Sequence, residues 1–248
     1  MATTASYQAS FSGFAACGIA PDTTARLLRR SVALARSAVP SGRRCWVAAS
    51  VGPYGAALAD GSEYRGRYGL SVAQLADWHR PRLEVLASAA PDVLALETVP
   101  DVDEAAALVA ALDGIDVPAW LSYSISGTRT RAGQPLEEAF AVAASTTQVV
   151  AVGVNCCDPA DVGPALAIAR AVAGKPVIVY PNSGEGWDAA RRRWTGRARF
   201  SAALVESWLE AGAAAVGGCC RVGPAEIAAV ARVLRGAAEA NGPHDQPR

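Results

Sequence analysis

Short apolar runs rich in β-branched residues alternate along the chain with longer, alanine-rich stretches of helical periodicity. This alternation predicts βα units around a parallel sheet. The expected strands are residues 2–7, 45–51, 92–97, 119–124, 149–155, 176–180 and 213–217. The expected helices are residues 23–39, 71–90, 101–112, 136–145, 159–172, 200–211 and 224–240. The pattern thus predicts an α/β protein with seven βα units.

Several expected helices begin with residues that suit a helix start. Ser71 and Asp101 are expected to accept hydrogen bonds from first-turn amides, and Pro159 and Pro224 suit a position that needs no amide proton. No internal repeat, linker or low-complexity segment divides the chain. We therefore expect one domain over residues 1–240, followed by a disordered tail at 241–248.

Polar and reactive side chains fall at the carboxyl ends of the expected strands. In chain order they are Tyr7, Gln8, Ser50, Tyr54, Glu97, Thr98, Ser122, Ser124, Asn155, Cys156, Tyr180, Asn182, Ser183, Cys219 and Cys220. In a βα barrel all strand ends open onto one mouth, whereas a doubly wound open sheet gathers ligands only near its switch point. The barrel is therefore favoured, although a closed barrel of this kind needs eight strands.

Composition and charge narrow the possible partners. The chain has 248 residues, 51% of them hydrophobic, with 23 acidic and 23 basic side chains. This balance excludes the strong positive field that non-specific nucleic-acid binding needs. No apolar run reaches the roughly 18 residues of a membrane span, and no signal-peptide pattern opens the chain. We expect a cytoplasmic protein with small-molecule partners, no nucleic acid and no membrane.

The six cysteines are expected to be reduced thiols rather than a disulfide framework, because the chain is neither short nor visibly secreted. Four of them form two adjacent pairs, Cys156 with Cys157 and Cys219 with Cys220. Each pair can present a thiol to a metal, but cysteine is also a small hydrophobe that is often buried. Cys156 and Cys219 lie 63 positions apart and no C-x-x-C is present, so spacing alone leaves both interpretations open.

Six segments together resemble the homocysteine S-methyltransferase family. They are ATTASYQASFSGF at 2–14, SVGPYGAALADGSEYRG at 50–66, LALETVPDVDEA at 94–105, VGVNCCDP at 152–159, VIVYPNSGE at 177–185 and VGGCCRVGPAEI at 216–227. The resemblance implies an eight-stranded TIM-type (β/α)8 barrel. It also implies a zinc ion, whose G-x-N-C and G-G-C-C motifs map onto Cys156, Cys219 and Cys220.

The same resemblance implies the reaction and the remaining site residues. The zinc-bound thiol of homocysteine would take a methyl group from S-methylmethionine or S-adenosylmethionine and become methionine. The expected substrate-binding residues are Glu97, Asn155 and Tyr7. Glu97 resembles the carboxylate that holds the substrate ammonium, Asn155 is also expected to orient the first ligand's loop, and Tyr7 is expected to line the mouth. Cys157, Cys17 and Cys45 are expected to be buried bystanders.

Two alternatives stay open beside this reading. One keeps the site but changes the acceptor to a related thiol or selenol such as selenocysteine. The other is a zinc-binding barrel without activity. Family members usually begin with a further strand and helix carrying an Asp-Gly-Gly-like segment, and this sequence starts directly at the second strand. We therefore expect a barrel lacking its first βα unit: either an incomplete gene product, whose extended form is soluble and active, or a poorly active, association-prone barrel.

Overall fold

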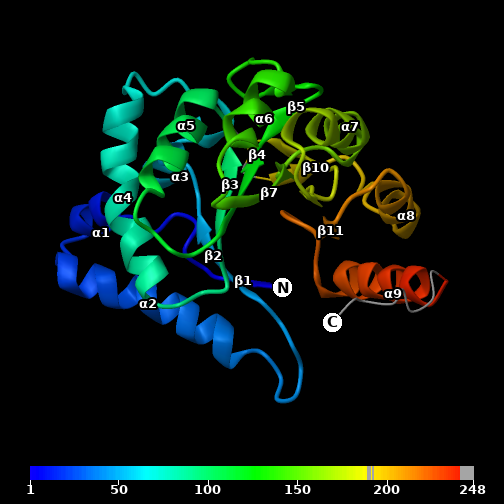
Figure 1. Ribbon diagram of the computed structural model, residues 1–248, viewed down its shortest axis with the longest axis horizontal. Coiled ribbons are helices and arrows are strands. Elements are labelled where there is room, and N and C mark those ends of the chain that lie inside the picture. The colour runs from blue at the N-terminus through cyan, green and yellow to red at the C-terminus, as the bar shows by residue number, and fades with distance from the viewer. Residues whose placement is uncertain (189–190, 192, 241–248) are drawn as a thin grey trace.

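A computed structural model describes residues 1–188, 191 and 193–240 of the chain, and its centre is a parallel sheet (Figure 1). The sheet has seven strands that pair in chain order with every neighbour parallel. They are β1 (Ala2–Thr3), β2 (Val47–Val51), β3 (Val93–Val99), β4 (Ala119–Tyr123), β7 (Val149–Asn155), β8 (Val177–Tyr180) and β11 (Ala215–Val216). The expected tail at 241–248 lies outside the described residues.

A long helix follows each strand of this sheet. These helices are α2 (Pro21–Ser37), α4 (Val72–Ser88), α5 (Val102–Ala111), α6 (Leu136–Ala144), α7 (Val162–Ala173), α8 (Ala202–Glu210) and α9 (Pro224–Ala240). Ser71 and Asp101 accept first-turn hydrogen bonds, as predicted. Figure 1 shows the helices ranged around one side of the curled sheet, from α2 in blue to α9 in red.

Side chains alternate along each strand, so the two faces of the sheet carry different residues. Leu94 and Leu96 belong to the large core between sheet and helices. Ala95, between them, belongs to a smaller cluster on the concave face, with Trp120 at its centre. Because side chains alternate with a period of two, Glu97 falls on the concave face as well. Because the sheet is curled, polar side chains near the ends of its strands face the interior of the curl.

The expected barrel-type α/β fold is confirmed, in the form of an open, curled seven-stranded sheet. In the described residues β1 and β11 form the two edges, and no pairing joins them. The sheet is therefore a barrel wall with a seam between its first and last strands.

The first strand is shorter than the predicted 2–7. Beyond β1 the chain still runs beside β2, but side-chain hydroxyls take over the hydrogen bonds. The Ser50 amide donates to Thr4 Oγ1 at 2.9 Å, and Ser6 Oγ donates to the Ser50 carbonyl at 2.7 Å. Such side-chain bonds compete with a regular backbone ladder and end the strand.

The loops at the carboxyl ends of the strands carry small elements that apolar periodicity did not predict. These are α1 (Phe11–Ala16), α3 (Tyr54–Leu58), the 3-10 turn Ser62–Tyr64, and the hairpins β5 (Ile125–Ser126) with β6 (Arg129–Thr130) and β9 (Gly186–Asp188) with β10 (Arg193–Thr195). Each is too short to show a hydrophobic period. The 3-10 turn Pro159–Asp161 is the start of the helix expected at 159–172. The 3-10 turns and the two hairpins line the mouth of the curled sheet.

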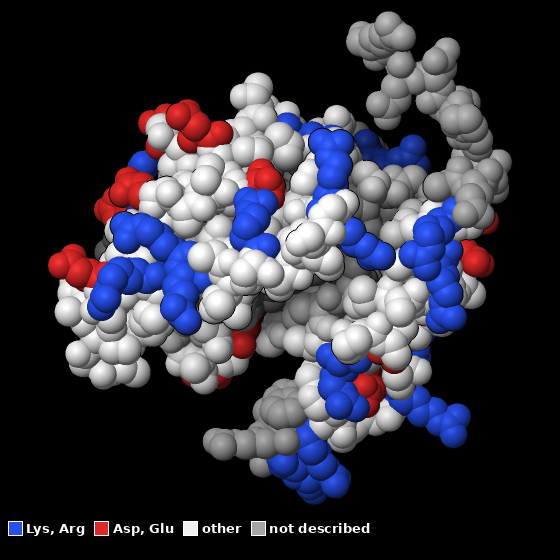
Figure 2. Space-filling model, turned by 90° about the horizontal axis from the view of Figure 1, so that it is seen from below, with Lys and Arg blue, Asp and Glu red and all other residues white. Residues whose placement is uncertain are grey.

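The surface seen from below in Figure 2 mixes basic and acidic side chains, with a basic group on the left where α2 lies. Some of these arginines are paired, such as Arg36 with Asp92 at 2.6 Å. No helix in the described part of the chain has the length and apolar character that crossing a bilayer requires.

Candidate metal centre and active site

Three cysteines from two distant strand ends converge at the mouth of the curled sheet. Cys156 directly follows β7, and Cys219 and Cys220 follow β11. The Sγ atom of Cys156 lies 2.8 Å from that of Cys219 and 3.6 Å from that of Cys220. The loops are pinned by backbone bonds, since the Cys219 amide donates to the Pro181 carbonyl at 2.7 Å. The convergence predicted from the barrel is therefore present.

Two glycines precede the cysteine pair, and the second leaves no room for a side chain. A Cβ atom on Gly218 would lie 2.1 Å from Val222 Cγ1, whereas one on Gly217 would meet only Tyr180 Cβ at 3.3 Å. Neither glycine has a positive φ angle. At Gly218 the requirement for glycine is therefore space rather than a left-handed turn.

Asn155 ties the end of β7 to the end of β3. Its Oδ1 accepts from the Thr98 amide at 2.8 Å, and its Nδ2 donates to Thr98 Oγ1 at 2.7 Å. Thr98 and Cys156 both have left-handed backbone angles, with φ of 61° and 50°. Such a conformation costs a non-glycine residue about 1–2 kcal/mol, so the bonds from Asn155 hold a strained pair in place. A contact of Asn155 with substrate stays a prediction.

The thiol cluster holds negative charge unevenly. Hydrogen bonds from Cys156 and Cys219 lower the pKa of Cys220 to about 3, and the bond with Cys156 raises that of Cys219. The opposite shifts at adjacent thiols show that three thiolates would repel one another at these distances. Three thiolates need a positive ion among them.

The geometry and chemistry of the three sulfurs fit a zinc ion. All three Sγ atoms lie within 4.8 Å of one another. Zinc–sulfur bonds of about 2.3 Å at tetrahedral angles place neighbouring sulfurs about 3.8 Å apart, near the 3.6 Å between Cys156 and Cys220. The 2.8 Å between Cys156 and Cys219 is about 1 Å shorter, so these two sulfurs would move apart to hold the ion. Three cysteines would also leave one tetrahedral position for a further ligand.

Glu97 lies on the concave face, 8% exposed, and accepts a hydrogen bond from Ser50 Oγ. Burial raises its pKa above 4.5, opposed by hydrogen bonds from Ser50 and Tyr180. Tyr180 in turn accepts from Trp120 Nε1 at 2.9 Å. A buried carboxylate without a cationic partner among the described residues can receive a positively charged group of a ligand.

Two tyrosines approach the cysteines from the loops. Burial raises the pKa of Tyr7, and a hydrogen bond with Thr98 lowers it. The nearby charges of Cys156 and Glu97 raise it further. Tyr7 therefore lies at the mouth, where the sequence placed it. Tyr64, on the 3-10 turn after α3, was not predicted: its hydroxyl donates to Cys156 Sγ at 3.6 Å. It falls within the segment 50–66, but no periodicity marks it as a site residue.

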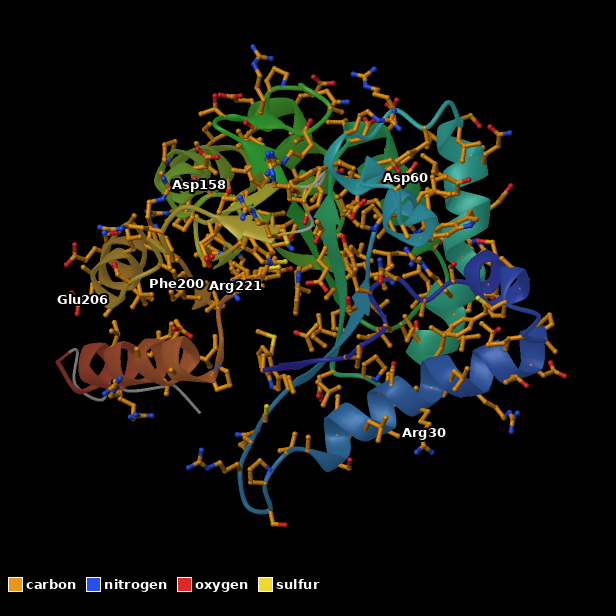
Figure 3. The ribbon with its side chains drawn as sticks, turned by 180° about the vertical axis from the view of Figure 1, so that it is seen from behind. Arg30, Asp60, Asp158, Phe200, Glu206 and Arg221 are labelled. Carbon is orange, nitrogen blue, oxygen red and sulfur yellow. The ribbon has the colours of Figure 1, made fainter. Side chains whose placement is uncertain are left out.

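A cavity of about 740 Å³ opens beside Cys156 and Cys220. The side chains that give it its character are Tyr64, Arg131, Asp158, Asp161, Glu185 and Trp194. Asp158 pairs with Arg199, and Glu185 pairs with Arg221 at 3.1 Å. Figure 3 shows Asp158 and Arg221 on the side of the sheet where α7 and α8 lie. The cavity is large enough for a small molecule beside the thiols.

The remaining cysteines differ from one another. Cys157 is fully buried in the core between sheet and helices, and burial raises its pKa, as a bystander requires. The prediction that Cys17 and Cys45 are buried is wrong. Cys17 is exposed at the end of α1, a helix without buried residues, and Cys45 is partly exposed before β2. Composition alone does not place a cysteine that lies outside the regular elements.

The fold and the site together define a protein of the βα-barrel class, with a cluster of thiols at the carboxyl ends of its strands, where enzymes of this class have their active sites. A family model for homocysteine S-methyltransferase matches residues 1–234. The chain therefore belongs to the homocysteine S-methyltransferase family and is a methyltransferase.

Individual relatives agree with this assignment. Homocysteine S-methyltransferase 4 of Zea mays is 44% identical over 254 residues, which cover 93% of this chain and 74% of that protein. Selenocysteine Se-methyltransferase of Brassica oleracea var. italica is 41% identical over 258 residues, covering 94% and 74%. The metallated crystal structure of the homocysteine methyltransferase MmuM from Escherichia coli has a TM-score of 0.80 and 40% identity, with 93% of this chain and 78% of that chain covered.

Proposed function

We propose that the protein transfers a methyl group from a sulfonium donor to the thiol of homocysteine at a zinc ion held by Cys156, Cys219 and Cys220. The observation that carries this proposal is the convergence of the three sulfurs within 4.8 Å. When bound, zinc lowers the pKa of the acceptor thiol and so favours the nucleophilic thiolate. Reduced cysteines also suit a reducing compartment, for which we propose the cytoplasm.

The transfer needs little further chemistry from the protein. The acceptor sulfur uses a lone pair to form a bond to the methyl carbon, and the carbon–sulfur bond of the donor breaks with its electrons going to the donor sulfur. The donor leaves as a neutral thioether, and the thiol proton goes to solvent. No general acid is required, because the leaving group carries no negative charge. The side chains of the site therefore bind and orient.

Glu97 is the proposed partner of the acceptor's ammonium group. It is buried and lacks a cationic partner among the described residues, and Ser50 and Tyr180 hold its carboxylate on the concave face. A bound ammonium would supply the missing positive charge. Tyr7, next to Glu97 and Thr98, would then close the mouth over the acceptor.

A related selenol is a second candidate acceptor, because a selenocysteine Se-methyltransferase is 41% identical to the chain. Selenium and sulfur acceptors present the same kind of nucleophile to the donor. The two acceptors compete in one assay, in which the specificity constants for homocysteine and selenocysteine are compared with S-methylmethionine as donor. We expect homocysteine to be preferred.

The proposal is tested by measuring zinc content and methionine formation on the same preparation of reduced protein. We expect about one zinc per chain and methionine formed from homocysteine with S-methylmethionine or S-adenosylmethionine. Cys219→Ser should lose most of the zinc and most of the turnover. Zinc-loaded protein that methylates neither acceptor with either donor would contradict the proposal and favour a barrel without activity.

A further inference from the structure

We propose that the cavity beside Cys156 and Cys220 is the subsite of the methyl donor, where Arg131 binds the donor's α-carboxylate. The inference rests on the proposed function, since it concerns the donor of the same reaction. The ligand class is a sulfonium amino acid with a free carboxylate, a chemistry that S-methylmethionine and S-adenosylmethionine share. The two donors differ in one substituent on the sulfonium sulfur, and both are measured in the experiment.

The cavity has the size and position that a donor requires. Its volume of about 740 Å³ lies within the range of small-molecule sites. Its wall includes two of the three proposed zinc ligands, Cys156 and Cys220. A molecule in the cavity would therefore reach the point at which the acceptor sulfur is activated.

Arg131 enters the cavity with the end of its side chain available. It follows the hairpin of β5 and β6, and its Nε atom donates to Ser124 Oγ at 3.3 Å. No carboxylate in the described ranges pairs with its guanidinium, although three acidic side chains line the same cavity. Two of those, Asp158 and Glu185, are already paired with Arg199 and Arg221. The planar fork of the guanidinium is thus left for a carboxylate from a ligand.

Tyr64 lies between Arg131 and the sulfurs. The Arg131 guanidinium lies 5.5 Å from the centre of the Tyr64 ring, and the Tyr64 hydroxyl lies 3.6 Å from Cys156 Sγ. A donor whose carboxylate is held at Arg131 would therefore extend along the ring toward Cys156. Aromatic faces attract cations, so Tyr64 and Trp194, which also lines the cavity, suit the sulfonium.

The acceptor is expected on the other side of the thiol cluster. Cys219, Glu97 and Tyr7 do not line the cavity. Tyr180 contacts Glu97 and also lies near Cys219. Burial raises the pKa of Tyr180, and the charges of Glu97 and Cys219 raise it further. The cluster thus has Glu97 on its inner side and Arg131 on its outer side. This arrangement lets an acceptor thiol and a donor methyl group approach each other from opposite sides.

The test removes either the positive charge of Arg131 or the negative charge of the donor's carboxylate. Specificity constants are measured for S-methylmethionine and for its carboxamide, which lacks the carboxylate, in the parent, Arg131→Gln, Arg131→Lys and the control Arg129→Gln. Arg129 is an exposed arginine of the same hairpin that bonds the Gly133 carbonyl and lies outside the cavity wall. In Arg131→Gln we expect a roughly 10- to 100-fold loss for S-methylmethionine, the range of a charged hydrogen bond, little change for the carboxamide, and partial recovery in Arg131→Lys. Arg129→Gln should match the parent.

Other outcomes overturn the assignment. Equal losses for both donors would make Arg131 a structural residue, and a rise in KM confined to homocysteine would place it at the acceptor. S-Adenosylmethionine measured in the same variants shows whether the larger donor uses the same carboxylate contact. If the parent transfers no methyl group, the proposed function fails. Calorimetric titration of S-methylmethionine into the parent and both glutamine variants then decides the role of Arg131, because an unchanged Kd in Arg131→Gln refutes it.

Discussion

Cys156 and Cys157 are adjacent in the chain but lie in different surroundings. Cys156 faces two other thiols, whereas Cys157 packs in the core between sheet and helices. We expect Cys156→Ser to lose most of the bound zinc and of the turnover, because one of three ligands is gone.

Cys157→Ala is the matched control for that variant. It removes a buried sulfur without a polar partner, so a small loss of stability is expected, with zinc content and activity near those of the parent. Metal analysis by mass spectrometry, alongside the melting temperature, separates the two effects. A large zinc loss in Cys157→Ala would refute the ligand assignment.

Glu97 gives the site a dependence on pH. Burial raises its pKa, and only the charged carboxylate can pair with an ammonium. Homocysteine binding should therefore weaken as the pH falls through that raised pKa, at values above the ordinary 4.5. Glu97→Gln keeps the size of the side chain but loses the charge, which should cost about 1–3 kcal/mol of binding and remove this part of the dependence.

Measuring Kd for homocysteine from pH 5 to pH 8, by titration of both proteins, checks this prediction. The thiols respond to pH in both variants, so the difference between the two curves isolates Glu97. Equal affinities for homocysteine in the folded parent and variant would remove Glu97 from the acceptor site.

The three clustered cysteines could be predicted from the sequence, and their neighbours in space could not. Cys156 and Cys219 follow strands and Glu97 lies near the carboxyl end of β3, so a barrel brings them to one mouth. Tyr64 and Arg131 reach the same mouth from loops, where no period relates position in the chain to position in space. Their proximity depends on how the loops fold over the strand ends.

At the scale of elements, a buried network ties α4 and α5 to the loop that carries Tyr64. His79 Nδ1 lies 2.7 Å from Arg82 Nη2, and His79 Nε2 lies 3.0 Å from Glu104 Oε1. Glu104 also accepts from the Tyr54 amide at 2.5 Å and from the Tyr68 hydroxyl at 3.2 Å. Burial and the charge of Arg82 hold the pKa of His79 below its ordinary value, so the ring is neutral. Burial raises the pKa of Glu104 to about 7, opposed by the hydrogen bond from the Tyr54 amide and the charge of Arg82.

Glu104→Gln should therefore destabilise the protein strongly. It removes the charge that faces Arg82 across His79 and one acceptor from the hydrogen bonds of the Tyr54 amide and the Tyr68 hydroxyl, which should cost about 1–3 kcal/mol. Chemical denaturation measures the free energy of unfolding. Glu84→Gln, an exposed glutamate of α4, is the control and should change it by less than about 0.5 kcal/mol. Similar values for the two variants would show that the carboxylate of Glu104 does not stabilise the buried Arg82.

Element boundaries were predicted best where the strand is long and apolar. Residues 149–155 form β7 as expected, because a buried central strand reads as a nearly continuous hydrophobic run. At the sheet edge, the run 2–7 contains hydroxyl side chains that replace the backbone ladder after Thr3. The hairpins β5–β6 and β9–β10 have no apolar period, so only tertiary structure defines them.

At the scale of the whole molecule, the open seam leaves apolar surface at the amino ends of the strands. A cavity of about 570 Å³ there is lined by residues such as Met1, Val150 and Trp46, and Trp46 is 66% exposed. With β1 and β11 as unpaired edges, we expect the chain of residues 1–248 to associate reversibly as its concentration rises.

Sedimentation velocity over a range of concentrations measures this association. Trp46→Lys should shift the equilibrium toward monomer, because the charge opposes burial of the surface. Val72→Lys, at an exposed apolar position at the start of α4, should behave like the parent. A parent that stays monomeric at all concentrations would show that the seam does not mediate association.

The two hydrogen bonds between Asn155 and Thr98 also fix a distance within the site. It joins the ends of β3 and β7 across β4, so the carboxylate of Glu97 and the sulfur of Cys156 are held at a fixed separation. If Glu97 binds the ammonium of the acceptor and a zinc ion beside Cys156 binds its thiol, this separation sets the length of the carbon chain that fits between them. An acceptor one methylene shorter would have to give up one of the two contacts, and so the protein would select its substrate by span as well as by chemistry.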